Sequence, residues 1–398
     1  MKTIKIVLFI CFFALLILLG YIGTFSRMMA DDYCTAAKAL EIGVFPSVSW
    51  WYISWSGRFT ATLLDSIAGW IGPDFAPIQP ALILSLWLIA LFVAFRRFGQ
   101  SILDAMLLSS AFIVVVLSIM PNMTQSLYWG QGMHSVIPPL VLFAALFAIK
   151  CPWLAFLAAF IMGGFSETFD AAALPLLFLL RISWKEKRSF LAAALMGLLV
   201  SFTIVALAPG NTVREARLNA SPGIIGASST ALESLANFFL IGVVKHGWVY
   251  LAIPTLALLL GWKPSEKITK WLILWLPFVI LVLLFSCFFP IALLGNIDLP
   301  PRADIIPQSI LVAGLFLWFC AIWAKVKPGK AALFASAAIL VCLFIFIVPI
   351  VLQPFPSIRA YSERWDSSTA HLPGNNPIID ESWDGIQQCF QSYRAVSH

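Results

Sequence analysis

The stretch Leu8–Tyr33, LFICFFALLILLGYIGTFSRMMADDY, indicates the character of the whole chain. It has no charged residue before Arg27, and about 20 apolar residues are enough to cross the hydrocarbon core of a bilayer. The apolar run is too long for a signal peptide and lacks a small-residue cleavage site, so we expect an uncleaved membrane helix over 5–27. The acidic pair Asp31-Asp32 follows where this helix would meet water.

The composition extends this pattern to all 398 residues. Hydrophobic residues make up 61% of the chain and charged residues 11%, and the mean hydropathy is +0.93. A soluble domain carries about 25% charged residues, so a soluble fold is excluded, as are disordered, collagen-like and disulfide-scaffold classes. The 33 Phe and 16 Trp suit a bilayer protein with aromatic belts.

Eleven apolar runs are candidate membrane spans. The expected fold is therefore an all-α, polytopic transmembrane bundle of about 11 spans, with a membrane domain over 1–352 and a short tail over 353–398. The runs that flank Lys150 and Ser166-Glu167 are short, and we expect them to be tilted, broken or partly re-entrant. The runs lie at 5–27, 81–95, 102–120, 135–149, 151–165, 171–184, 189–208, 236–261, 271–290, 307–324 and 331–352.

The distribution of Lys and Arg predicts the orientation. With a cytoplasmic N-terminus, 15 of the 25 basic residues but only three of the 19 acidic ones fall in loops on that side, as the positive-inside rule requires. An odd number of spans then puts the tail outside, together with a long first loop over 28–80 that holds an interfacial helix over 48–64. Topology explains the basic balance, so no nucleic-acid partner is expected.

Carboxylates on the external side are the first candidates for chemistry. Asp31 and Asp32 follow the first span, where one carboxylate can take a proton from a hydroxyl while the other orients the acceptor or binds Mg²⁺ or Mn²⁺. The alternative is a polar end to the helix. Glu167 and Asp170, in GGFSETFD, share a helical face and are costly near hydrocarbon unless they line a polar cavity or form ion pairs. Glu167 is therefore a further catalytic candidate and Asp170 a substrate-binding one.

Arginines on the same side are candidates for binding a phosphate. Arg58, Arg214 and Arg302 oppose the positive-inside bias, and a guanidinium fork suits a phosphate or diphosphate. Pairing with an outside carboxylate is the alternative for each. Tyr33, next to the acidic pair, is a candidate for substrate contact. His134 has no second histidine at ligand spacing, so a packed, interfacial or substrate-facing role is favoured over a metal site.

Two cysteines and the start of the tail also lie outside. A disulfide between Cys34 and Cys389 is compatible with an oxidising compartment, but two free thiols are the favoured interpretation. The segment Tyr361–Asp366 would either cover the site from above or begin a salt-bridged helix.

Short motifs give this layout a family resemblance. The motifs are Ala30-Asp31-Asp32-Tyr33, Trp55-Ser56-Gly57-Arg58, Pro209-Gly210-Asn211 followed by Arg214, Pro301-Arg302-Ala303, and Trp365-Asp366. With the long first external loop and about eleven spans, the chain resembles the GT-C superfamily of integral membrane glycosyltransferases, and bacterial multi-pass proteins in particular. Many members end in a large soluble domain, whereas only 353–398 follow the last span here.

The resemblance implies an activity and a location. It implies inverting transfer of a sugar from a polyprenyl-phosphate donor to a glycan or lipid acceptor of the cell envelope, at the outer face of a bacterial inner membrane. Asp31 or Asp32 matches the first-loop acid that acts as general base, and a divalent metal is compatible with this mechanism but not required by it.

Three other functions stay open from the sequence. A transporter or flippase for lipid-linked glycans would carry charges near the bilayer midplane and two related halves, and neither feature is apparent. A polymerase or ligase for lipid-linked glycans is poorly separated from the first choice. A non-catalytic subunit of an envelope assembly would use the external charges as an interface.

Overall fold

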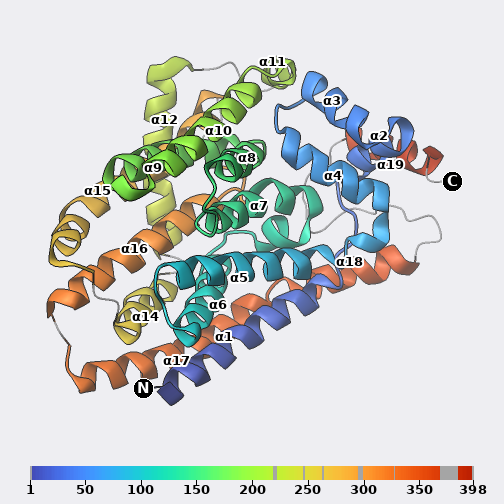
Figure 1. Cartoon of the computed structure of the whole chain (residues 1–398). Coiled ribbons are helices and arrows are strands. Elements are labelled where there is room, and N and C mark those ends of the chain that lie inside the picture. The colour runs from blue at the N-terminus through green and yellow to red at the C-terminus, as the bar shows by residue number, and fades with distance from the viewer. Residues whose placement is uncertain are drawn as a thin grey trace.

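The computed structural model describes residues 2–217, 222–244, 247–261, 264–294, 299–326, 328–367 and 384–396. Regular structure in these residues is helical throughout (Figure 1), which confirms the all-α prediction. The two termini lie at opposite ends of the helical bundle (Figure 1).

Seven helical segments in the described part of the chain are long and apolar enough to cross a membrane. They are Lys2–Gly23, Gln79–Arg97, Lys185–Ala206, Gly223–Gly242, Glu266–Leu293, Ile305–Val326 and Lys330–Ser367. Five shorter apolar helices accompany them, at Phe59–Ile71, Ile102–Ser118, Gly130–Leu146, Pro152–Gly163 and Val249–Leu260. The chain is therefore a multi-pass membrane protein, and the total of eleven spans stays a prediction.

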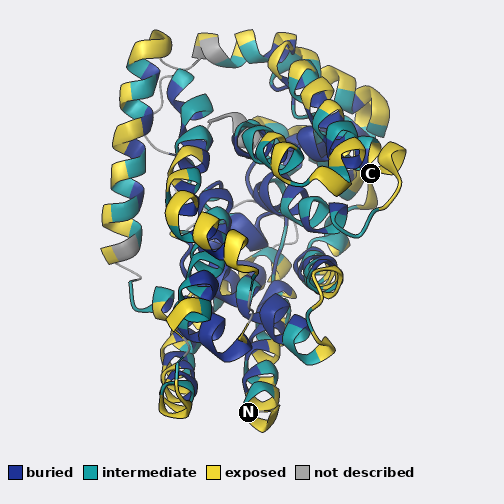
Figure 2. Cartoon of the chain, turned by 60° about the vertical axis from the view of Figure 1, so that its left-hand side comes forward, coloured by how far each residue is buried: buried dark blue, intermediate teal, exposed yellow. Residues whose placement is uncertain are grey.

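The faces of these helices match a bilayer environment. Buried residues turn toward the centre of the bundle, while exposed ones follow the outward faces (Figure 2). Large apolar side chains stand on those outward faces, among them Ile10, Ile17 and Trp153. Exposure of such side chains to water would be unfavourable, but in a bilayer they contact acyl chains.

The first group of packed helices contains α1 (Lys2–Gly23), α5 (Gln79–Arg97), α6 (Ile102–Ser118) and α7 (Gly130–Leu146). Helix α1 packs against α5 and α6, and α5 packs against α7. An ion pair of 2.7 Å between Lys5 Nζ and Asp104 Oδ1 links α1 to α6.

The second group contains α8 (Pro152–Gly163), α9 (Glu167–Ser183), α10 (Arg188–Ala206), α15 (Glu266–Leu293) and α16 (Ile305–Val326). Helix α10 packs on α8 and α9, and α15 packs on α9 and α16. A Cβ at Gly197 would lie 2.2 Å from the Phe156 carbonyl oxygen, so this glycine allows α8 and α10 to approach closely, as small residues do in membrane bundles.

One predicted span differs from the structure. The run 236–261 is not a single helix, because α12 (Gly223–Asn237) begins earlier and continues as a π-helical turn over Phe238–Val243. A separate helix, α14 (Ala252–Leu260), follows. The segment Gly223–Gly242 has a mean hydropathy of only 1.4, against 2.9 for Lys2–Gly23, so its polar residues hid its N-terminal part from a search for apolar runs.

The loop over 28–80, which the sequence places outside, is helical, but its helices are not those predicted. Instead of one helix over 48–64, the structure has α3 (Val44–Ser54) and α4 (Phe59–Ile71), preceded by α2 (Asp32–Ile42). The interruption lies at Gly57, where a Cβ would be 2.3 Å from the Val205 carbonyl oxygen. The chain passes directly against the end of α10 at this point, a close approach that a Cβ would obstruct.

The tail packs back onto this loop. After α17 (Lys330–Leu352) come α18 (Phe355–Ser367) and α19 (Asp384–Val396), and α19 packs on α2. Cys34 and Cys389 form a disulfide, so the favoured interpretation of two free thiols is wrong. From the sequence this disulfide was only an alternative, and the packing of α19 on α2 is what brings the two cysteines together. Helices α2, α3, α4 and α19 gather at the end of the bundle that holds the C-terminus (Figure 1).

Candidate functional site

A pocket at this end is lined by ionisable side chains from four parts of the chain. Asp32 begins α2, Asp65 lies on α4, His134 lies on α7, and Arg27 lies between α1 and α2. About 30 Å³ of the pocket is open to water, which is room for a few water molecules. A hydroxyl group fits this space.

Asp32 joins two turns of backbone at the wall of this pocket. Its Oδ2 accepts the Met29 N–H at 2.9 Å, and its Oδ1 accepts the Gln131 N–H in the first turn of α7 at 3.1 Å. Burial raises the pKa of Asp32 well above its ordinary value, the charges of Asp31 and Asp65 add to that rise, and the two amide hydrogen bonds oppose it. Asp32 is therefore an anchored carboxyl group.

Asp31 does not share this position. Of the predicted acidic pair, Asp32 is the member that lines the pocket. The Asp31 carbonyl oxygen accepts a hydrogen bond of 2.7 Å from the Gln131 side-chain amide. Just before the pair, Ala30 adopts a φ of +47° although it is not glycine, and this left-handed conformation costs roughly 1–2 kcal/mol for an L residue. The strained turn directs the two carboxylates to different surroundings.

His134 and Asp65 form a hydrogen-bonded pair inside the pocket. His134 Nδ1 lies 2.7 Å from Asp65 Oδ1, and the two side chains are 9% and 11% exposed. Asp65 was not among the residues singled out from the sequence. Its position, as the one carboxylate of the apolar segment FTATLLDSIAGWI, was the available signal, because such residues are costly near a membrane and are retained for a purpose.

The described residues contain no group of three His, Cys, Asp or Glu side chains arranged to hold a metal ion. The expected Mg²⁺ or Mn²⁺ ligands Asp31 and Asp32 therefore lack a third protein ligand of these types among the described residues. Asp32, moreover, has both oxygens occupied by backbone amides.

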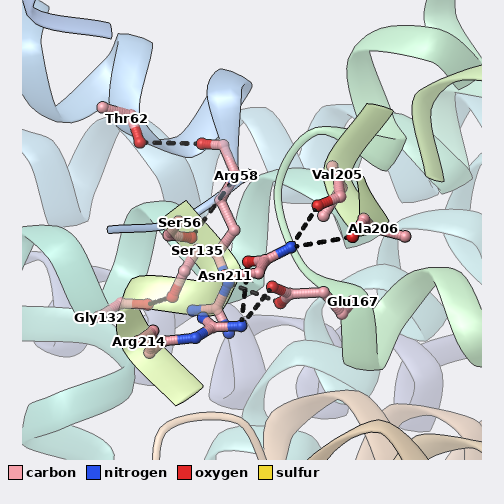
Figure 3. A network of polar contacts seen from close by, with 10 residues as sticks. All are labelled: Ser56, Arg58, Thr62, Gly132, Ser135, Glu167, Val205, Ala206, Asn211 and Arg214. Atoms are coloured by element: carbon pink, nitrogen blue, oxygen red, sulfur yellow. Dashed lines mark hydrogen bonds and ion pairs between the residues drawn. The ribbon is translucent and has the colours of Figure 1, made fainter. Parts of the chain in front are cut away.

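A second polar cluster lies beside the pocket and unites three predicted residues (Figure 3). Arg58 Nε donates to Glu167 Oε2 at 2.6 Å, and the Arg214 guanidinium donates to Glu167 Oε1 at 3.3 Å. Arg214 also donates to Asn211 Oδ1 at 3.4 Å, and Asn211 Nδ2 donates to the Val205 carbonyl at 2.7 Å. Glu167 thus sits between two arginines, which corresponds to the ion-pair alternative for these residues.

Glycine contacts bring two of the sequence motifs together in this cluster. A Cβ at Gly210 would lie 2.6 Å from the Ser56 backbone nitrogen, so Pro209-Gly210-Asn211 packs directly on Trp55-Ser56-Gly57-Arg58. One turn into α9, Asp170 is fully buried, and neither of its carboxylate oxygens has a hydrogen-bond partner among the described residues. No contact in the described residues supports the substrate-binding role expected for Asp170.

Arg302 does not line the pocket but lies near the start of α7. Its guanidinium carbon is 4.8 Å from the centre of the Trp129 ring, and Trp129 is the residue that precedes α7. The Arg302 carbonyl accepts the Ser126 hydroxyl at 3.4 Å. Arg302 therefore lies beside the N-terminal turn of α7, whose partial positive charge also favours an anion.

The tail covers the acidic turn. Arg27 forms two hydrogen bonds with the Asp366 carboxylate, at 2.8 and 2.7 Å, and the Tyr361 hydroxyl donates to the Met28 carbonyl at 2.7 Å. Trp365 Nε1 donates to the Tyr33 hydroxyl at 2.9 Å. Tyr33 itself is fully buried, and that burial raises its pKa to about 12.

These contacts bear on two expectations. The segment Tyr361–Asp366 lies in the C-terminal half of α18 and packs on the turn before the acidic pair, while its predicted role as a cover over the functional site stays a prediction. Tyr33 packs against Phe390 of α19 and is not a pocket-lining residue, so the substrate contact expected for it has no support in this arrangement.

Comparisons of the chain with protein-family models, with curated proteins and with solved structures find no match. The fold and the site together define a multi-pass helical membrane protein that has a polar, ionisable pocket at one end of its bundle.

Proposed function

We propose that this chain is a membrane glycosyltransferase that moves a sugar from a polyprenyl-phosphate donor to a glycan or lipid acceptor of the cell envelope. The pocket is the observation that supports this proposal. It places Asp32, Asp65, His134 and Arg27 at the end of the bundle where the C-terminus lies. Under the predicted orientation, this is the outer face of a bacterial inner membrane.

The division of charges supports transfer between a lipid-borne donor and a hydroxyl acceptor. The acceptor hydroxyl enters the pocket and loses its proton to an ionisable group there, a role that the sequence predicts for Asp31 or Asp32. Arg302, which lies beside the first turn of α7, is proposed to bind the donor phosphate, because the partial positive charge of that turn also favours an anion. Attack on the anomeric carbon from the side opposite the phosphate inverts its configuration.

The test is sugar transfer by the purified protein. Labelled polyprenyl-phosphate sugars and an envelope glycan or lipid extract are supplied, and the label in the acceptor and the released polyprenyl phosphate are measured. Ala76 lines the pocket, so Ala76→Trp should fill it and lower transfer at least tenfold. Ile78 is 56% exposed and lies outside the pocket, so Ile78→Trp is the matched control. No transfer by the wild-type protein from any donor would contradict the proposal.

A transporter for lipid-linked glycans is the second candidate, and Asp170 is the observation that favours it. A fully buried carboxylate without a hydrogen-bond partner among the described residues is typical of an ion or proton path in a membrane protein. Proteoliposomes distinguish the two functions, because a transporter moves the labelled donor across the bilayer with its sugar–phosphate bond intact. A transferase breaks that bond.

A further inference from the structure

We infer that His134, positioned by Asp65, is the group that removes the proton from the acceptor hydroxyl. This assignment rests on the proposed glycosyltransferase function and goes beyond it, since it replaces the acidic pair by a residue pair from α4 and α7.

Asp32 already has a structural role in the pocket. Each of its oxygens accepts a backbone N–H, from Met29 at 2.9 Å and from Gln131 at 3.1 Å. Both carboxylate oxygens therefore hold backbone at the wall of the pocket. A Cβ at Gly130 would lie 3.1 Å from Asp32 Oδ1, so the carboxylate is also held tightly against the start of α7. These contacts make Asp32 an anchor.

His134 has the opposite arrangement. The Asp65 carboxylate accepts the Nδ1 proton across 2.7 Å, which fixes the ring in the tautomer that has its lone pair on Nε2. Asp65 is the hydrogen-bond partner of this ring among the described residues, and both residues line the pocket. Nε2 is therefore the unoccupied basic atom of the pair, on a residue whose side chain is 9% exposed.

The transfer step balances with this assignment. The acceptor oxygen forms a bond to the anomeric carbon while the bond from that carbon to the phosphate oxygen breaks, and the electron pair leaves with the polyprenyl phosphate. The acceptor proton passes to His134 Nε2, and the Asp65 carboxylate stabilises the resulting imidazolium. The imidazolium then releases the proton to water at the pocket mouth.

Two variants of His134 distinguish loss of the basic nitrogen from loss of the folded structure. His134→Asn keeps a side-chain N–H near the position of Nδ1, so it can still donate to Asp65, but it has no base. We expect it to lower kcat about 10²- to 10⁴-fold, the usual worth of general-base catalysis, with the donor KM and the thermal unfolding midpoint near those of the wild type. His134→Ala leaves a space that a free base can enter. Added imidazole should therefore raise the kcat of this variant at least tenfold.

Asp65 is a positioning residue, and its test differs. Asp65→Asn should lower kcat without raising the donor KM. In His134→Ala rescued by imidazole it should have no further effect, because the free base does not depend on Asp65 for its place. Asp74→Asn, at an exposed carboxylate of the same loop, is the matched control. If Asp65 acted in folding alone, Asp65→Asn would lower the unfolding midpoint. It would also lower the transfer rate both in the otherwise wild-type protein and in His134→Ala rescued by imidazole.

The outcomes distinguish the assignment from the function on which it rests. Transfer by the wild type that survives His134→Asn within threefold overturns the role of His134 and leaves the glycosyltransferase function standing. An imidazole-insensitive His134→Ala with a native unfolding midpoint also overturns it. Failure of the wild type to transfer any sugar overturns the proposed function, and the assignment with it.

Discussion

At the scale of single residues, ionisable groups of the site make hydrogen bonds, but their burial also disfavours the charged form. Asp32 accepts two backbone hydrogen bonds, yet its burial still raises its pKa. The folded protein therefore binds a proton at Asp32 more readily than the unfolded chain does, so stability falls as the pH rises from about 4 through the raised pKa. Asp32→Asn removes this titration.

The measurement is the thermal unfolding midpoint in detergent as a function of pH. As the pH rises through that window, we expect the wild-type midpoint to decline relative to that of Asp32→Asn. Two curves that run parallel from pH 4 to pH 8 would show that Asp32 binds its proton equally well in the folded and unfolded states.

Arg302 carries the second prediction at this scale. If its guanidinium binds the donor phosphate, Arg302→Ala removes hydrogen bonds to a charged group, each of which contributes about 1.5–3 kcal/mol. Donor affinity should then weaken about ten- to a hundredfold, and Arg302→Lys should restore part of it because it keeps the charge but not the fork. Titration of a labelled polyprenyl-phosphate sugar measures both. Unchanged affinity in Arg302→Ala would show that Arg302 does not bind the donor phosphate.

At the scale of elements, glycines decide how closely the helices of the loop over 28–80 approach the rest of the bundle. A Cβ at Gly57 would meet the Val205 carbonyl oxygen at 2.3 Å, and this atom belongs to the backbone of α10 and cannot move aside cheaply. Gly57→Ala should therefore destabilise the protein by about 1–3 kcal/mol and disturb the ion pair between Arg58 and Glu167. Gly329→Ala is the control, because nothing lies within 4 Å of its added Cβ. Equal unfolding midpoints for the two variants would contradict the tight contact.

At the scale of the whole molecule, the charge distribution and the disulfide bear on the same topology. Reporters fused after residues 98, 328 and 398 should give cytoplasmic, cytoplasmic and external signals, because basic residues favour the cytoplasm and the termini lie at opposite ends of the bundle. A membrane-impermeant thiol reagent should label Cys34 and Cys389 from outside only after reduction, since disulfides persist in oxidising compartments. A cytoplasmic signal at 398 would reverse the predicted position of the tail.

The sequence predicted most helices of the bundle but not how its loops are folded. Runs such as 271–290 are apolar enough to require a helix in lipid, because no water is present there to satisfy the backbone, and α15 covers that run. The run 236–261 failed because α12 is less apolar than its neighbours. The break at Gly57 was missed because it depends on contact with α10.

The sequence by itself determined that this is an all-α membrane protein. Long apolar runs partition into the bilayer, and in lipid their backbone must satisfy its own hydrogen bonds by forming helices. It also indicated the acidic turn and the arginines as candidate functional residues, since charged residues are rare in this chain. Only the tertiary structure decided their partners. Asp65 and His134 are 69 residues apart, and Cys34 and Cys389 are 355 apart. Local sequence does not predict such pairs, because they form only when the packing of distant helices brings the side chains together.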